Sequence, residues 1–503
     1  MGAQNYGRVV DVQRVRREQE PALITEGEVW TYGRLADSVG SFAAYLAEHG
    51  VGKGDRVAIE GMNSPEFVCA VLAIYRLGAV AVPLNYRLQE EELGYLLKNS
   101  GSVALLADRE FVAVLARATD GFPLRAKVSL DGEEAGWDSF ADIMVRYEGR
   151  STPVAEVAAG DPQRIMYTSG TTSRPKGVTV THGMAALNAL VQLSELGLTS
   201  ADRVLVSSPL YHVAAWDAPG VAVLFAGGAM VLMRKFEPAT ALDMMERHGV
   251  TGGIFVQAML HGLRSASGDG RDLSRLRWVI FGAAAGELYR EIREMLPTTR
   301  LVQAYGMTEA CSAIAYMDEA HAVSKLGSAG SAVPFVEYRV VDENDDEVPA
   351  GVVGEIVMRG PKVTPGYWAD EELTAQAWRG GWFHTGDVGM VDADGFVTIT
   401  DRLKDMIRSG GENVAGQEIE RVLYSHPAIS EAAVIGVPDP RWQEVPKAFV
   451  VRKAGSAITE AEVIAHCRAS LASFKTPKYV EFRESLPRNP SGKVLKRVLR
   501  EEG

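Results

Sequence analysis

The sequence predicts an α/β fold: a large N-terminal domain of doubly wound parallel sheets with a β-rich subdomain, followed by a small α+β domain. Three observations predict it. At 503 residues the chain is longer than one hydrophobic core usually supports. Residues 31–107 and 203–306 alternate strands with helices, which is typical of parallel sheets covered on both faces. Residues 330–400 instead show alternating strand patterns separated by Gly-Asp turns.

The elements of the first block follow from local patterns. Apolar side chains recur at helical intervals over residues 31–50, and Gly50 ends the run. Ser64 followed by Pro65 is a typical N-cap and first position of a second helix. The remaining expected elements are strands at 56–60, 79–83 and 103–107 and a helix at 90–99.

The second block is predicted to contain strands at 204–207, 230–233, 279–281 and 301–304. Ligands of open α/β sheets bind beyond the carboxyl ends of the strands. The loops after these strands are therefore where chemistry is expected: PLYHVAAW at 209–216, FGAAAGE at 281–287 and QAYGMTEAC at 303–311.

Composition excludes several classes of protein. The net charge is −13, which argues against nucleic acid or an anionic membrane as a general partner. Cys69, Cys311 and Cys467 have neither disulfide nor zinc spacing, which fits a reducing cytoplasm. We expect no transmembrane segment, because the longest uncharged stretch, 218–233, is interrupted by Pro219 and is too short to span a bilayer.

The stretch MYTSGTTSRPKGVTVT, residues 166–181, is a candidate phosphate loop. It offers hydroxyls, backbone N–H groups and the Lys176 ammonium to a polyanion, and Gly170 and Gly177 let the main chain approach a ligand. A polar β-hairpin turn is the alternative. A Walker loop is a poor match, because Lys176 leads into a strand and not into a helix.

The stretch QAYGMTEAC has a second set of suitable groups. Tyr305 could stack on a purine, Thr308 could contact phosphate, and Glu309 could hold Mg²⁺ beside phosphate oxygens. The alternative is a helix start with Thr308 as its cap.

These motifs resemble those of the adenylate-forming (ANL) superfamily, in its acyl-CoA synthetase branch of fatty-acid and aryl CoA ligases. YTSGTTSRPKGV resembles the phosphate-binding loop of that family, and WFHTGDVG, DRLKD and PSGK follow in the family's order over almost the whole chain. The resemblance implies an adenylate-forming domain over residues 1–400, with the β-rich subdomain at 330–400, a hinge at 401–405 and a mobile lid domain at 406–503.

The resemblance also implies the reaction and its cofactors: ATP, Mg²⁺ and CoA. A carboxylate attacks the α-phosphate of ATP, which yields an acyl-AMP and pyrophosphate. The lid then turns about Lys404, the Gly410–Gly411 loop enters the site, and the CoA thiol displaces AMP. Lys493 would meet the α-phosphate and the carboxylate in the first step. Lys496, Arg497 and Arg500 are interpreted as a basic tail.

The site residues implied by the resemblance fall into four sets. The catalytic set is Lys493, His212, Lys404 and Glu309, and the metal set is Thr168 and Glu309. The nucleotide set, in which Asp387 accepts the ribose hydroxyls, is Thr168, Ser169, Gly170, Thr171, Thr172, Lys176, Gly282, Ala283, Ala284, Tyr305, Gly306, Thr308, Asp387 and Arg402. The acyl pocket is His212, Ala214, Trp216, Ala218, Phe255, Met259, Ala285 and Met307.

The pocket residues predict a hydrophobic substrate. Ala214, Ala218 and Gly306 are small where larger groups could have closed the cavity, which favours a bulky or polycyclic hydrophobic acid. Aryl, medium-chain and long-chain acids remain open. No Arg or Lys falls in the pocket segments, which argues against a dicarboxylate.

Other functions are carried as alternatives. They are a ligase that loads a carrier protein, a luciferase-like oxygenase, and a non-catalytic nucleotide-binding module; a homodimer is also considered. Ser173 stands where the family's loop has glycine, and Gly416 stands where proline is common. Ser173 would weaken the ATP half-reaction, whereas Gly416 would loosen the lid segment used in the thiol half-reaction. The resulting alternative is a ligase with impaired adenylation that mainly thioesterifies an acyl-AMP supplied by an upstream adenylating partner.

Overall fold

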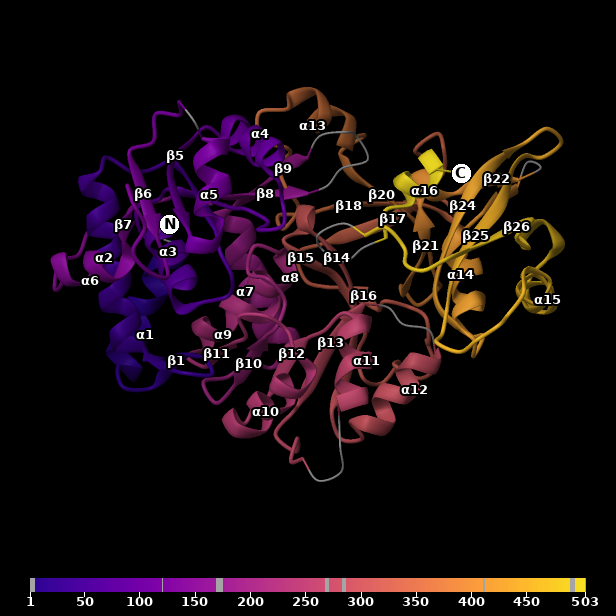
Figure 1. Ribbon diagram of the computed structural model, residues 1–503, viewed down its shortest axis with the longest axis horizontal. Coiled ribbons are helices and arrows are strands. Elements are labelled where there is room, and N and C mark those ends of the chain that lie inside the picture. Colours follow the sequence, from indigo (N-terminus) through magenta and orange to yellow (C-terminus); the bar gives the residue numbers. More distant parts are fainter. Residues whose placement is uncertain are drawn as a thin grey trace. The chain divides into compact units, whose positions relative to one another are not determined.

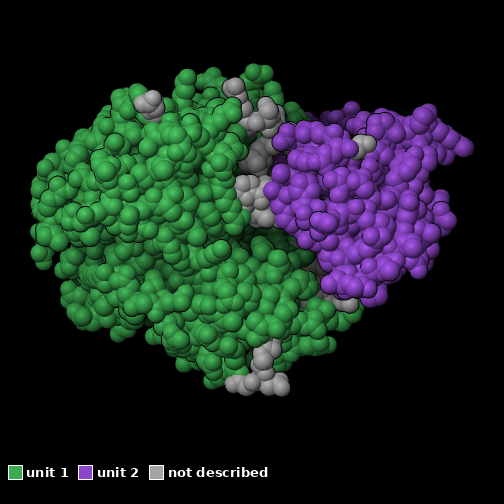
Figure 2. Space-filling view, in the orientation of Figure 1, with its two compact units in different colours: residues 1–337, 358–383 green, residues 338–357, 384–503 purple. Residues whose placement is uncertain are grey.

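The computed structural model describes residues 5–119, 121–168, 175–266, 271–282, 286–409, 412–488 and 494–502. Packing divides the chain into two compact units, coloured in Figure 2. Unit 1 contains residues 1–337 and 358–383, and unit 2 contains residues 338–357 and 384–503. This division by packing differs from the expected division at 401–405, where rotation about a hinge stays a prediction.

Unit 1 contains two large sheets (Figure 1). The N-terminal sheet has the order β7-β6-β5-β3-β4-β8-β9. Its strands are β3 (Arg56–Glu60), β4 (Val80–Pro83), β5 (Ser102–Ala107), β6 (Ala126–Ser129), β7 (Asp138–Ser139), β8 (Pro162–Thr168) and β9 (Lys176–Thr181). All neighbours pair in parallel except β8 and β9, which form an antiparallel hairpin at one edge.

The central sheet has the order β16-β15-β14-β13-β12-β10-β11-β1-β2. Its strands are β1 (Pro21–Ile24), β2 (Val29–Thr31), β10 (Arg203–Val206), β11 (Ala229–Leu232), β12 (Gly252–Ile254), β13 (Trp278–Gly282), β14 (Arg300–Met307), β15 (Ser312–Tyr316) and β16 (Ser331–Ala332). The run from β14 to β11 is parallel, so its carboxyl ends share one edge.

Helices connect these strands. They are α1 (Val9–Arg17), α2 (Tyr32–Glu48), α3 (Pro65–Arg76), α4 (Glu90–Ser100), α5 (Arg109–Ala118), α6 (Phe140–Arg146), α7 (His182–Leu196), α8 (Val213–Ala215), α9 (Val221–Ala226), α10 (Pro238–His248), α11 (Gln257–Ala266), α12 (Gly286–Met295) and α13 (Glu371–Ala377). The predicted start of α3 is confirmed, since the Ser64 hydroxyl accepts a hydrogen bond from the Phe67 N–H and Pro65 is the first helical residue.

Unit 2 contains the lid sheet, in the order β23-β22-β25-β24 with β26 beside β25. These strands are β22 (Ile407–Ser409), β23 (Glu412–Val414), β24 (Ile429–Asp439), β25 (Gln443–Arg452) and β26 (Tyr479–Arg483), and the helices are α14 (Gly416–Tyr424), α15 (Glu460–Ser470) and α16 (Lys496–Glu502). A smaller sheet has the order β17-β18-β20-β19 with β21 beside β20: β17 (Glu337–Val341), β18 (Gly354–Arg359), β19 (Trp378–Arg379), β20 (Trp382–Val391) and β21 (Val397–Arg402).

The predicted α/β fold with parallel sheets is confirmed. Among the strands absent from the sequence-based prediction is β12, since two of its three residues, Gly252 and Gly253, have no side chain to show a strand pattern. A Cβ at Gly252 would lie 2.2 Å from the Trp278 ring, so packing against the next strand requires glycine. Among the described residues, no helix is both long and apolar enough to span a bilayer.

Candidate active site

The base of the candidate phosphate loop is a β-hairpin in unit 1. Thr168 ends β8 and Lys176 begins β9, and the two are cross-strand partners. Ser169, Gly170, Thr171 and Thr172, together with Ser173, lie outside the described residues. A Cβ at Gly177 would lie 2.9 Å from the Ile165 side chain, so packing inside the hairpin, and not only access for a ligand, requires this glycine.

The motif residue Glu309 lies in a turn that joins β14 to β15. The turn spans Thr308–Ala310, and the Glu309 side chain is 8% exposed. Its carboxylate accepts a hydrogen bond of 3.1 Å from the Tyr367 hydroxyl, and its backbone oxygen accepts one of 2.7 Å from the Thr364 N–H. The segment 364–367 therefore holds Glu309 through both its side chain and its backbone.

Tyr367 joins this turn to the phosphate-loop hairpin. The Lys176 ammonium lies 5.2 Å from the centroid of the Tyr367 ring, within the range of a cation–π contact. Burial raises the pKa of Tyr367, and the neighbouring Glu309 raises it further. The raised pKa keeps the phenol protonated, so it donates to the Glu309 carboxylate. Tyr367 was not among the site residues predicted from the sequence, because the stretch GYW is typical of an ordinary turn.

These groups suit a magnesium–phosphate complex. Glu309 supplies a carboxylate and Thr168 a half-buried hydroxyl, both hard oxygen donors of the kind that Mg²⁺ prefers. Across the part of the chain that the structure describes, no three His, Cys, Asp or Glu side chains gather as ligands. At nucleotides, Mg²⁺ is usually held by one or two carboxylates and by substrate phosphates.

The other nucleotide residues of unit 1 follow β13 and β14. Gly282 is exposed at the end of β13, and Ala283 and Ala284 lie outside the described residues. Tyr305 is 8% exposed, while Thr308 is half-buried. The structure therefore brings Gly282, Tyr305 and Thr308 to one edge of the central sheet.

The predicted acyl-pocket residues separate into two groups. His212, Ala214, Met259 and Met307 are exposed or half-buried where β10, β12 and β14 end, whereas Ala285 lies outside the described residues. Trp216, Ala218 and Phe255 are 2%, 2% and 1% exposed, so they lie behind this surface. Val256, within the predicted segment 255–259, is 55% exposed and adds an apolar side chain to the same edge.

His212 is held in a defined orientation. It is the N-cap of α8, and its Nδ1 accepts a hydrogen bond of 3.2 Å from the Ala214 N–H. Desolvation by the surrounding protein lowers the pKa of His212, which favours the neutral ring although its edge is exposed. A neutral imidazole is a suitable wall for an uncharged aromatic or aliphatic group.

Packing explains why position 306 is a glycine, and the sequence alone did not show this. A Cβ at this position would lie 2.2 Å from the Ser312 backbone oxygen, and Gly306 pairs with Ala313 across the β14–β15 irregularity. Strand pairing therefore requires glycine here. The absence of a side chain at Gly306 gives no separate argument for a large cavity.

A buried polar network lies behind the motif turn in unit 1. The Arg164 guanidinium donates to both carboxylate oxygens of Asp217, at 2.6 and 2.5 Å, and to the Cys311 sulfur at 3.3 Å. Lys362 is also fully buried and donates to Asn188 and to two backbone oxygens. An arginine inside the apolar strand PQRIMYT and an aspartate inside AAWDAPG were the sequence signals for this network.

In unit 2, Asp387 and Arg402 are brought together by adjacent strands. They are cross-strand partners in β20 and β21, and Arg402 Nε lies 2.5 Å from the Asp387 carboxylate. Gly386 has a φ of +69°, a left-handed conformation that bends the strand just before Asp387, as predicted. The Asp387 N–H donates to the Thr385 hydroxyl, which donates to the Ile356 oxygen.

The predicted hinge and lid residues are described only in part. Lys404 belongs to the turn Leu403–Asp405, but its side chain, like Gly410, Gly411 and Lys493, lies outside the described residues. The basic-tail interpretation is wrong for two residues. Lys496 pairs with Glu420 at 2.7 Å and Arg500 with Asp405 at 2.8 Å, because α16 packs onto the lid; Arg497 is exposed.

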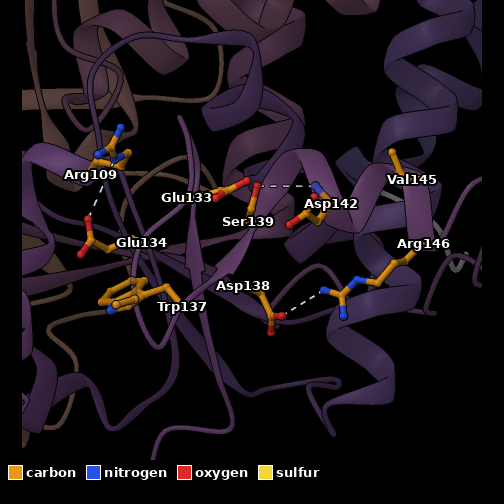
Figure 3. Close-up of a pocket in the computed structure, with 10 residues that line it drawn as sticks. Arg109, Glu133, Glu134, Trp137, Asp138, Ser139, Asp142, Val145 and Arg146 are labelled. Atoms are coloured by element: carbon orange, nitrogen blue, oxygen red, sulfur yellow. Dashed lines mark hydrogen bonds and ion pairs between the residues drawn. The ribbon is translucent and has the colours of Figure 1, made fainter.

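An open hollow of about 860 Å³ occurs elsewhere in unit 1 (Figure 3). It is lined by residues of α5, β7 and α6 and by residues 133–137, near the edge of the N-terminal sheet opposite to the β8–β9 hairpin. Its charged groups face each other, as in the Arg146–Asp138 pair at 2.9 Å. None of the predicted site residues lines it, so it is not a candidate for the reaction.

The chain matches two family models in the order that its motifs predict. Residues 10–368 match the AMP-binding enzyme model, and residues 418–493 match the AMP-binding enzyme C-terminal domain. The chain belongs to the AMP-binding enzyme family. This confirms the predicted adenylate-forming family and, with it, the enzyme class of acid–thiol ligase.

Several relatives match along their whole length. The chain is 40% identical over 496 residues to a feruloyl-CoA synthase from Amycolatopsis sp, covering 97% of each chain. It is 36% identical over 475 residues to an indoleacetate–CoA ligase from Aromatoleum aromaticum, covering 94% of this chain and 92% of the relative.

Solved structures agree in fold. The anthranilate CoA ligase AuaEII in complex with anthranoyl-AMP superposes with a TM-score of 0.91 at 27% identity, covering 99% of this chain and 97% of that one. The o-succinylbenzoate CoA synthetase of Bacillus subtilis with its acyl-adenylate gives 0.88 at 32% identity, covering 99% and 98%.

Proposed function

We propose that this chain is a CoA ligase for a hydrophobic carboxylic acid that carries an aromatic ring. The observation that carries the proposal is the placement of Lys176, Tyr367 and Glu309 at the base of the phosphate loop, in a chain of the AMP-binding family. This arrangement offers one ammonium and one carboxylate to a metal–triphosphate, as formation of an acyl-AMP requires.

In the first half-reaction, the acid attacks the α-phosphate of ATP and pyrophosphate leaves. Mg²⁺ at Glu309 and Thr168, when bound, offsets the phosphate charge that would repel a carboxylate nucleophile. Lys176 and the loop hold the phosphates, Asp387 and Arg402 bind the ribose, and Lys493 neutralises charge on the α-phosphate. Tyr367 keeps the Glu309 carboxylate oriented toward the phosphate loop.

The acid is proposed to be aromatic for two reasons. The edge formed by His212, Val256, Met259 and Met307 is apolar apart from a neutral imidazole. The relatives named above are, by their names, ligases of feruloyl, indoleacetate, anthranilate and succinylbenzoate groups, all of which contain a ring. A bulky or polycyclic acid stays within this proposal.

In the second half-reaction, CoA is proposed as the thiol that displaces AMP. The lid would turn about Lys404 and bring Gly410 and Gly411 to the acyl-AMP. The same relatives are named as CoA ligases, which favours CoA over a carrier protein. Gly416 begins α14, where an added Cβ would lie 3.0 Å from the Val434 oxygen, so packing gives a reason for glycine here besides a looser lid. The hypothesis of impaired adenylation rests on Ser173.

The test is a panel of acids incubated with ATP, Mg²⁺ and CoA, with products identified by mass spectrometry. We expect acyl-CoA, AMP and pyrophosphate from aromatic acids, and little product from straight-chain fatty acids or from malonate. Product only on a phosphopantetheinylated carrier protein, or ADP in place of AMP, would overturn the proposal.

A matched pair of assays separates the half-reactions. Lys493→Ala should abolish acyl-AMP formation and leave thioester formation from a synthetic acyl-AMP largely intact. Equal loss in both steps would remove the argument for a lid that changes position. Ser173→Gly should leave adenylation unchanged if the loop accepts serine, and should accelerate it if adenylation is impaired.

A further inference from the structure

Lys362 is a fully buried cation with three acceptors around it. It is 0% exposed, and lysine is almost never fully buried without partners. Its Nζ lies 2.7 Å from the Ala310 backbone oxygen, 2.9 Å from Asn188 Oδ1 and 3.3 Å from the Cys311 backbone oxygen. An ammonium carries three N–H donors, so these three oxygens use all of them.

Two of these acceptors belong to the turn that carries Glu309. After Ala310, Cys311 and Ser312 have φ values of +50° and +90°, which non-glycine residues rarely adopt. Lys362 draws the Ala310 and Cys311 oxygens toward one point, and the Thr364 N–H binds the Glu309 oxygen at 2.7 Å. The segment 362–364 thus holds three successive carbonyls of the motif turn.

The third acceptor links the turn to the predicted pocket segment. Asn188 accepts from Lys362 through its oxygen and donates from its Nδ2 to the Asp217 backbone oxygen at 2.9 Å. The Asp217 carboxylate is bound by Arg164 of β8. A continuous buried chain therefore joins the phosphate-loop hairpin, the segment 216–220 and the Glu309 turn, all within unit 1.

We propose that Lys362 is a positioning residue for adenylation, which fixes the backbone of the Glu309 turn so that its carboxylate meets the metal–phosphate complex. The inference rests on the proposed function, because it needs Glu309 to act on Mg²⁺ and phosphate. Replacing buried charged groups by apolar residues of similar size is often neutral or stabilising. That rule applies when all partners of a buried network are replaced together; removing Lys362 alone would leave three buried oxygens without a donor. The experiment must therefore separate positioning from stability.

The experiment replaces Lys362 by methionine and uses Arg76→Met as a matched control. Arg76 is also a buried cation of unit 1, but it donates to the Thr152 oxygen at 2.8 Å and to Asp11 at 2.7 Å, away from the motif turn. ATP affinity is measured by calorimetry with and without Mg²⁺. The KM values for ATP and for the acid are measured by pyrophosphate release.

Mg²⁺ is expected to increase the affinity of the wild-type protein for ATP. In Lys362→Met we expect this increase to be smaller by about tenfold, which is the contribution of one charge-assisted hydrogen bond. KM for ATP should rise while KM for the acid and thioester formation from synthetic acyl-AMP stay close to wild type. Arg76→Met should keep the wild-type effect of Mg²⁺. Lys362→Arg, which keeps the donors, should recover part of the loss.

Three results would overturn the inference. The first is a folded Lys362→Met variant whose ATP affinity responds to Mg²⁺ as in wild type. The second is an equal loss of this response in Arg76→Met. The third is a failure of all Lys362 variants to fold, including Lys362→Gln, which would assign the residue to stability alone. Failure of the proposed function looks different: the wild-type protein itself would then show no Mg²⁺-dependent ATP binding.

Discussion

The two motif carboxylates, Glu309 of unit 1 and Asp387 of unit 2, are held in opposite ways. Glu309 accepts a hydrogen bond from a neutral phenol, Tyr367, and the nearby cation Lys362 binds the backbone of its turn. Asp387 pairs directly with the guanidinium of Arg402 at 2.5 Å. We propose that the carboxylate bound by the phenol serves a metal ion and that the one paired with arginine serves uncharged hydroxyls.

Two residues of the same type in one protein therefore need not have the same function. A carboxylate that binds Mg²⁺ must offer negative charge, and a neighbouring arginine would compete for it. A carboxylate that accepts ribose hydroxyls needs orientation more than charge, and a charge-assisted pair supplies orientation. The predictions below test this contrast.

The largest effect is expected for Glu309→Gln. The amide keeps the shape and accepts the Tyr367 hydrogen bond, but it removes the charge on which the metal depends. We expect the rate of acyl-AMP formation to fall by about 10²–10³, in line with the loss of one electrostatic contact to the reacting groups. Excess Mn²⁺ should restore part of it. A variant within about twofold of wild type in pyrophosphate release would contradict the metal assignment.

A smaller loss is expected for Asp387→Asn. Hydrogen bonds to a charged group contribute about 1.5–3 kcal/mol, so KM for ATP should rise by about ten- to a hundredfold. The requirement for Mg²⁺ should stay unchanged, because this carboxylate does not bind the metal. The check is steady-state kinetics with ATP and with 2′-deoxy-ATP. If the variant still prefers ATP as strongly as wild type does, the ribose assignment is wrong.

Tyr367→Phe tests the phenol that orients Glu309. It removes one hydrogen bond to a carboxylate, worth about 1.5–3 kcal/mol in full, but the carboxylate itself remains, so adenylation should slow by only about three- to tenfold. The ring remains for the contact with Lys176, so the affinity for ATP without Mg²⁺, measured by calorimetry, should hardly change. Since the pKa of Tyr367 is raised by burial, no loss from its ionisation is expected as the pH is raised toward its ordinary value.

A separate effect, on stability and not on the reaction, is expected for Lys362. Burial lowers the pKa of Lys362 from 10.5 to about 8, so between these values the unfolded chain binds more protons than the folded one. The free energy of unfolding of the wild type, relative to Lys362→Met, should therefore rise with pH across this window and be lowest below it. Urea melts of the two proteins at several pH values check the sign. A difference that falls with pH would contradict it.

Much of the fold was accessible from the sequence because local signals agreed. The Ser64–Pro65 start of α3 and the strand at 56–60 match the structure to the residue. Strand β12, which the prediction missed, has two glycines. The Trp278 ring requires the glycine at 252, and no local pattern shows this contact between residues distant in sequence. The role of Gly306 in strand pairing was hidden for the same reason.

The residues of the candidate site also fall into those that local sequence patterns indicate and those that only the structure shows. Glu309, Asp387 and Arg402 could be proposed from the sequence because each lies in a short motif of unusual composition. Tyr367 and Lys362 could not, because their roles come from contacts with residues more than 50 positions away, such as Glu309 and Ala310. A lysine after a Gly-Pro pair looks like a surface loop in sequence, and only the packed structure shows that it is buried.

The contrast between the two carboxylates is tested most directly by one measurement: calorimetric binding of ATP and 2′-deoxy-ATP, each with and without Mg²⁺, to wild type, Glu309→Gln and Asp387→Asn. The account predicts that Glu309→Gln no longer binds ATP more tightly when Mg²⁺ is added, but still prefers ATP to 2′-deoxy-ATP. It predicts the reverse for Asp387→Asn. Loss of both properties in both variants, or an exchange of the two, would contradict it.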